Sequence, residues 1–186
     1  EFRRVLFRSP GDGISDAVFM SSRDGTHWDR TFMEAWLRAG PETRNWTHRN
    51  QTPAVGIVET ADEWSLYTAS HYGWASNRLQ RLAVRPHGFA SVRAGYHGGE
   101  FTSKPLTLTG DALRLNYATS AIGSIRIEVQ DAEGRIIEGF ALEDSEPLFG
   151  DELDAAWPAD FSALKGQNVR LRFVLQDADL FALRST

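Results

Sequence analysis

Short runs of apolar and β-branched residues, separated by turn residues, occupy the first half of the chain. Residues 17–22 form such a run, which ends at Arg23-Asp24-Gly25 and resumes at Trp28, and this predicts a β-hairpin. A segment rich in Gly, Pro, Asn and Thr, residues 38–53, is predicted to be a long loop, and loops of this length in compact proteins are usually functional. The strand pattern predicts three further strands, at residues 54–60, 64–72 and 78–85.

In the second half of the chain, apolar and polar residues alternate. Alternation with a period of two places one face of a strand in the core and the other in solvent, as in an antiparallel sheet. The segment Asp131-Ala132-Glu133-Gly134 between two such runs predicts a hairpin turn in which Gly134 takes a positive φ. Several such strands within about 100 residues predict a β-sandwich. The alternating apolar positions are Leu113, Leu115 and Tyr117, then Ile125, Ile127 and Val129, then Val169, Leu171, Phe173 and Leu175.

Composition and charge exclude several classes of function. The 186 residues contain no Cys, which excludes disulfide scaffolds, thiolate metal sites and cysteine nucleophiles. The net charge is −5 and no basic block occurs after the first few residues, so a nucleic-acid partner is not expected. There is no run of about 18 apolar residues, so no membrane span is predicted.

The Trp and His residues lie mostly in the first half of the chain, so any catalytic or binding chemistry is expected there. Five of the six Trp residues precede residue 75, and all five His residues lie between residues 27 and 97. The spacing of His71 and His97 does not argue for a metal site, and no metal or other cofactor is predicted. Sequence signatures of nucleophile elbows, zinc proteases and phosphate-binding loops are absent from the sequence.

Residues 1–9, Glu-Phe-Arg-Arg-Val-Leu-Phe-Arg-Ser, resemble the in-frame translation of a sequencing adapter. We expect them to be an artefact and exclude them from fold reasoning. The natural N-terminus, with any signal peptide, would then lie upstream of this fragment.

The segment Ser22-Arg23-Asp24-Gly25-Thr26-His27-Trp28 is the most specific local pattern in the sequence. Its Asp can accept hydrogen bonds from backbone N–H groups of the turn, its Gly opens the turn, and Trp28 is expected to pack beneath the hairpin. Similar turns in β-propeller glycosidases and sialidase-like proteins are structural. The motif therefore indicates a propeller blade and not an active site.

Residues 18–183 resemble the C-terminal part of bacterial secreted proteins related to the furanosidase superfamily, which contains invertase-like, levanase-like and arabinanase-like five-bladed propeller glycoside hydrolases. The resemblance is specific for the architecture and weak for the activity. It is carried by residues 19–30 (Phe-Met-Ser-Ser-Arg-Asp-Gly-Thr-His-Trp-Asp-Arg), 63–67, 88–92, 102–106, 123–131, 139–144 and 169–175.

The resemblance implies an all-β protein in two parts, a partial β-propeller followed by an antiparallel β-sandwich. Residues 10–85 would be the C-terminal blade region and residues 86–186 the accessory sandwich. In the family, the catalytic carboxylates lie on early blades, upstream of this segment, and glycoside hydrolysis needs two carboxyl groups flanking one bond. The catalytic residues are therefore left unassigned, and we expect this chain alone to be inactive. A secreted parent implies an extracellular or periplasmic location.

Some substrate-binding residues are expected in the loop that precedes residues 54–60, the predicted inner strand of the last blade. A Trp ring can stack on the C–H face of a sugar, while Arg and Asn can donate to its hydroxyls. The alternatives are a well-packed loop with its Trp as an anchor, and ion pairing for the two carboxylates. The candidates for carbohydrate binding are Trp46, His48, Arg49 and Asn50 in the loop, and the carboxylates Glu34 and Glu63.

An acidic cluster lies within residues 143–154 and consists of Glu143, Asp144, Asp151, Glu152 and Asp154. Oxygen-rich loops can hold Ca²⁺, but the spacing does not fit an EF-hand, and a solvated acidic loop is the favoured interpretation. For the whole chain, the alternative to a glycoside-hydrolase-like fragment is a non-catalytic carbohydrate-binding module or a structural β-sandwich module.

Overall fold

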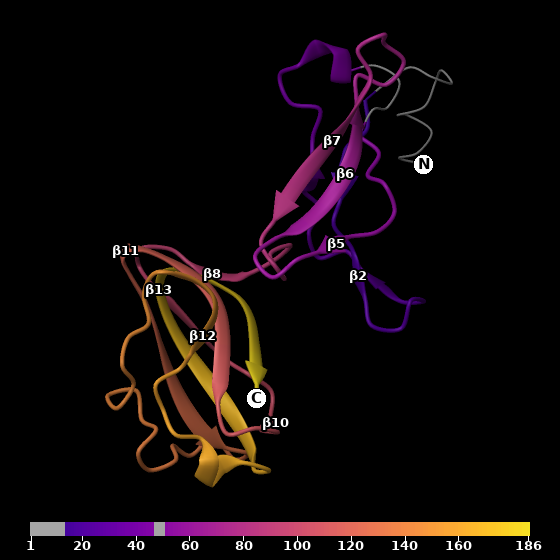
Figure 1. The fold of residues 1–186 in the computed structure, drawn as a ribbon. Coiled ribbons are helices and arrows are strands. Elements are labelled where there is room, and N and C mark those ends of the chain that lie inside the picture. The colour runs from indigo at the N-terminus through magenta and orange to yellow at the C-terminus, as the bar shows by residue number, and fades with distance from the viewer. Residues whose placement is uncertain (1–13, 47–50) are drawn as a thin grey trace. The chain divides into compact units, whose positions relative to one another are not determined.

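The computed structural model describes residues 14–46 and 51–186 (Figure 1). The chain divides into two compact units, residues 1–89 (unit 1) and residues 90–186 (unit 2). Apart from two short 3₁₀ turns, η1 (Thr43–Asn45) and η2 (Ser162–Leu164), the regular structure of the described residues is antiparallel β-sheet, with no sheet closed into a barrel. The predicted all-β class is therefore confirmed. Among the described residues, no helix has the length and apolarity needed to cross a bilayer.

The described residues of unit 1 form three small antiparallel sheets. Strand β1 (Ala17–Val18) pairs with β4 (Ala35–Leu37), and β2 (Ser21–Ser22) pairs with β3 (Trp28–Asp29). The largest sheet has the order β5-β6-β7, formed by Val58–Glu59, Trp64–Ser70 and Arg78–Val84. The hairpin expected around Asp24-Gly25 is confirmed by β2 and β3.

The interior of unit 1 is aromatic at one place and polar at another. Phe89 is the centre of the aromatic cluster, stacked on Phe19 with ring centroids 5.3 Å apart and contacted by Trp36 at 5.6 Å and Trp64 at 6.2 Å. Along β6, by contrast, several buried side chains are polar, and their hydroxyl groups need hydrogen-bond partners to offset lost hydration. These buried polar residues are Ser65, Thr68 and Ser70, with His71 directly after the strand.

Unit 2 is built on two long strands, β11 (Leu113–Asp131) and β13 (Asn168–Ser185), which pair along most of their length. Strand β12 (Asp151–Ala156) pairs with β11. Three short strands pair in succession with the other edge of β13. They are β10 (Leu106–Thr107), β9 (Gly99–Thr102) and β8 (Val92–Ala94). The sheet is visible in the lower half of Figure 1.

The alternation predicted for unit 2 matches the observed burial. On β13, Val169, Leu171, Phe173 and Leu175 are almost fully buried, and their cross-strand partners on β11 are Asp131, Val129, Ile127 and Ile125. The ladder is interrupted where Thr119 and Ser124 face Ala178 and Gln176, and Asp177 takes a φ of 42° there. After this irregularity the inward positions of β13 move from odd to even residues, so Ala178 and Leu180 also enter the core.

Two sequence-based predictions are wrong in detail. The run 54–60 is a strand only at Val58–Glu59, because Gly56 takes a φ of 99°, which interrupts the extended backbone. The neighbouring Val55 is fully exposed. In the acidic segment 143–154, the last residues are not a loop but the start of β12.

Candidate functional site

The candidate site lies at the end of unit 1 where η1 meets the turn that joins β6 to β7. Of the six predicted substrate-binding residues, Trp46 is at this end, immediately after η1, and its side chain is 55% exposed. The indole Nε1–H donates to the carbonyl oxygen of Gly40 at 2.8 Å, so one edge of the ring is anchored. Trp46 is thus anchored at one edge of its ring while more than half of the residue stays exposed.

The other predicted residues are not gathered around Trp46 in what the structure describes. His48, Arg49 and Asn50 lie outside the described residues. Glu34 is exposed before β4. Glu63 precedes β6 and forms an ion pair with Arg81 of the neighbouring strand, which also donates to Ser65 Oγ at 3.0 Å.

Sequence reasoning missed three residues of this end, His71, Tyr72 and Trp74. His71 follows β6 and is only 3% exposed. Tyr72 and Trp74 lie in the following turn and are 55% and 47% exposed. The available signal was the recurrence of three aromatic or imidazole residues around Gly73, which interrupts the strand pattern at a positive φ.

His71 is held by contacts from both loops. Its backbone N–H donates to Asn45 Oδ1 at 3.0 Å, and its Nδ1 lies 3.0 Å from Ser76 Oγ. The Arg78 guanidinium lies at the ring, with Nη1 3.0 Å from Nδ1, and the Glu42 carboxylate is 4.0 Å from Nε2. His71 also takes a φ of 57°, a conformation that costs a non-glycine residue roughly 1–2 kcal/mol. The surrounding contacts are what hold it there.

The backbone of both loops is fixed by hydrogen bonds. The N–H of Trp74 donates to the His71 carbonyl at 3.0 Å, and the N–H of Asn77 donates to the Trp74 carbonyl at 2.9 Å. On the other loop, the N–H of Trp46 donates to the Thr43 carbonyl at 3.0 Å. Asn45 joins the loops, because its Oδ1 accepts from the His71 N–H while its amide N–H donates to the Ala39 carbonyl of its own loop at 3.3 Å. The exposed rings are thus carried on ordered backbone.

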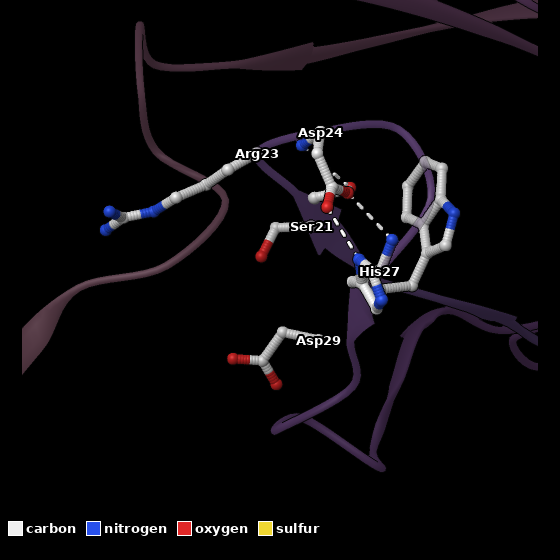
Figure 2. Close-up of a pocket in the computed structure, with 7 residues that line it drawn as sticks. Ser21, Arg23, Asp24, His27 and Asp29 are labelled. Atoms are coloured by element: carbon white, nitrogen blue, oxygen red, sulfur yellow. Dashed lines mark hydrogen bonds and ion pairs between the residues drawn. The ribbon is translucent and has the colours of Figure 1, made fainter.

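A second polar surface lies at the β2–β3 hairpin, around a hollow of about 630 Å³ (Figure 2). Asp24 Oδ1 accepts from the backbone N–H groups of Thr26 at 2.8 Å and His27 at 2.7 Å, while Oδ2 lies 2.6 Å from His27 Nδ1. Ser22 Oγ accepts from the N–H of Gly25 at 2.8 Å. The carboxylate is thus occupied by the turn itself, which agrees with a structural role for this motif.

The electrostatics of the hairpin follow from these contacts. Hydrogen bonds from the His27 ring, and then from the backbone N–H groups of His27 and Thr26, hold the pKa of Asp24 well below its ordinary value. Arg23 points away from the Asp24–His27 pair in Figure 2. Trp28 is 56% exposed, so the expectation that it packs beneath the hairpin is wrong.

Neither surface has the donor set of a metal centre. Within residues 14–46 and 51–186, no group of three or more His, Asp or Glu side chains is arranged to hold a metal ion. In the acidic segment, Asp154 of β12 instead forms ion pairs with Arg184 at 2.6 Å and Arg114 at 3.2 Å. The hydrogen bond from Arg184, and then the charges of both guanidinium groups, lower the pKa of Asp154.

In comparisons with known proteins, no family model, curated protein or solved structure matches the chain.

Proposed function

We propose that the chain is part of a secreted bacterial carbohydrate-active protein related to the furanosidase superfamily, with unit 1 derived from a β-propeller blade region and unit 2 serving as an accessory β-sandwich. The antiparallel sheets of both units and the core on one face of the β11–β13 sheet support this architecture. The proposed location is extracellular or periplasmic, where a polysaccharide partner would be met.

Within this protein, unit 1 binds an oligo- or polysaccharide. The observation that carries the proposal is the placement of Trp46, whose indole N–H is anchored to the Gly40 carbonyl while more than half of the side chain stays exposed. An exposed, oriented aromatic ring offers a flat apolar surface to the C–H face of a sugar, and polar groups nearby can bond its hydroxyls. Glu42, four residues before Trp46, has a side chain that is 46% exposed, and its carboxylate can accept hydrogen bonds from sugar hydroxyls.

Binding, and not hydrolysis, is the activity proposed for this chain. Two carboxyl groups must flank a glycosidic bond for hydrolysis, one of them free to exchange a proton. Glu63 is engaged by Arg81, which favours a role in holding the β6–β7 sheet over a role in catalysis. Glu34 lies directly before β4, which belongs to the separate β1–β4 sheet.

The test is affinity electrophoresis of the intact chain in gels containing levan, inulin or arabinan. Retardation by at least one polysaccharide is expected, with the retardation reduced in Trp46→Ala. The matched control is Trp28→Ala, because Trp28 is equally exposed but lies on the β2–β3 hairpin. Unchanged mobility in all three gels would leave the alternative, a structural module without a carbohydrate ligand. Release of reducing sugar by the purified chain would contradict the assignment of binding alone.

A further inference from the structure

The turn between β6 and β7 presents two large aromatic side chains at the same end of unit 1 as Trp46. Tyr72 and Trp74 are about half exposed, and both lie within three residues of His71. Figure 1 shows this turn and η1 at the same end of the β6–β7 hairpin. The hydrogen bond from His71 N–H to Asn45 Oδ1 connects the two segments directly.

The connection is rigid for three reasons. His71 is buried and is contacted by Ser76 and Arg78 from its own hairpin and by Asn45 from the η1 segment. Its positive φ is maintained against a conformational cost, so the chain reverses at a fixed point. The turn that follows is closed by the hydrogen bond from Trp74 N–H to the His71 carbonyl. A ligand would therefore meet rings whose backbone needs little ordering on binding.

The chemistry of this end differs from that of the exposed apolar surface before and on β5. There the exposed apolar side chains are aliphatic, namely Val55, Ile57 and Val58. At the η1 and β6–β7 end, Trp46, Tyr72 and Trp74 are exposed beside Leu79, and each of the three rings carries a polar N–H or O–H. Flat rings with polar edges suit a ligand that has an apolar face and many hydroxyls. A sugar has both.

We infer that Tyr72 and Trp74 form a second contact element for the same saccharide that Trp46 contacts, so that the ligand is a neutral oligosaccharide held by the η1 segment and the β6–β7 turn together. This inference rests on the proposed function. It adds a binding element on a segment for which the sequence predicted only the end of a strand.

The experiment records the indole N–H NMR signals of the intact chain while fructo-oligosaccharides, levan oligosaccharides and arabino-oligosaccharides are titrated separately. The signals of Trp46 and Trp74 are both expected to shift with the same midpoint for the oligosaccharide that binds. The signal of Trp28 is expected to stay unchanged, which controls for general effects on exposed indoles.

Variants then separate direct contact from loss of structure. Trp74→Ala and Tyr72→Ala should each weaken binding, by up to about tenfold for a lost ring contact, whereas Trp28→Ala should not. Both side chains are exposed, so an unchanged indole signal of Trp157, which is buried in unit 2, and of Trp64 on β6 checks that the fold is retained.

Three results overturn the inference in distinguishable ways. If Trp46 responds to a saccharide while the Trp74 signal and the affinity of Trp74→Ala and Tyr72→Ala are unchanged, the second contact element is wrong and the proposed function stands. If Trp74 and Trp46 respond with different midpoints, the two segments do not share one ligand. If none of the three saccharides shifts either signal, both the inference and the proposed function fail.

Discussion

Glu128 of β11 and Arg172 of β13 are directly opposite each other in the sheet of unit 2, on the face that points away from the apolar core. Nη1 of Arg172 lies 3.2 Å from Oε2 of Glu128, whose side chain is only 3% exposed. Gln130 donates to the other carboxylate oxygen at 2.7 Å, and Arg172 also contacts Glu100 of β9 at 2.7 Å. One guanidinium group therefore links three strands, and it neutralises a carboxylate that water hardly reaches.

Removing this guanidinium should destabilise unit 2 strongly. In Arg172→Met the Glu128 carboxylate stays buried without its counter-charge, and breaking a buried ion pair in this way costs about 3 kcal/mol. The free energy of unfolding can be measured with urea by following the indole signal of Trp157, the one Trp of unit 2. Arg126→Met is the control, because Arg126 is an exposed arginine on the same strand as Glu128 and its loss should change stability by less than about 0.5 kcal/mol. Equal losses of stability in the two variants would show that Arg172 does not stabilise unit 2 through the Glu128 carboxylate.

Truncation should destabilise unit 2 strongly at one phenylalanine and hardly at all at another. Phe173 is fully buried and stacked on Phe101 with centroids 4.9 Å apart, so Phe173→Ala leaves a cavity and should cost about 3–5 kcal/mol. Phe149 is 70% exposed, so Phe149→Ala should be nearly neutral. The same urea titration checks both, and a large loss from Phe149→Ala would show that its ring is covered in solution.

The β2–β3 turn should depend on pH through Asp24. Hydrogen bonds from the His27 ring and from backbone N–H groups stabilise the ionised carboxylate, so its pKa lies below the ordinary value of 3.8. A lowered pKa means that the carboxylate supports the turn fully above pH 3.8 and that this support is lost as the pH falls through the lower, folded value. Carboxyl NMR titration should give a midpoint below 3.8, and His27→Ala should raise it. Thr26→Ala should leave it unchanged, because Thr26 contributes only its backbone N–H.

Gly123 should not tolerate a side chain. A Cβ at this position would lie 2.4 Å from the carbonyl oxygen of Asp177 and 2.8 Å from that of Gln176, both backbone atoms of the paired strand. Gly123→Ala must therefore push β11 and β13 apart at the irregularity in their ladder, with a cost of roughly 1–3 kcal/mol. Gly95→Ala is the control, because a Cβ there meets no atom within 4 Å. In thermal unfolding, Gly123→Ala should lower the midpoint temperature and Gly95→Ala should leave it nearly unchanged.

The strands of unit 2 were predictable because burial there follows a simple rule. Where Val169, Leu171 and Phe173 alternate with Arg170 and Arg172, the sequence identifies the inward face directly, and the structure buries those three side chains. The hairpin at Asp24-Gly25 was equally predictable from the sequence, because the Asp24 carboxylate and the positive φ of Gly25 act on backbone within a few residues.

The candidate site was less predictable because long-range contacts create it. Trp46 could be selected by residue type, but its connection to the β6–β7 turn depends on the hydrogen bond between Asn45 and His71, which are 26 positions apart. Strand propensity also failed to mark β12, where Asp151, Glu152 and Asp154 occupy an edge strand. Pairing with β11, and the ion pairs of Asp154 with two arginines, compensate there for a poor strand sequence.

The order in which the chain is synthesised matters for unit 2 because β13 pairs with β8, β9, β10 and β11. The sheet cannot assemble until this strand has been made, and Ala94 must wait for its partner Ala178. At roughly 5–20 residues per second, the earlier strands spend on the order of ten seconds without their central neighbour. Contacts of such long sequence separation also fold slowly once the chain is complete. Unit 2 is therefore a domain whose nascent form exposes apolar strand faces for most of its synthesis, and a chaperone that shields extended segments would raise its yield.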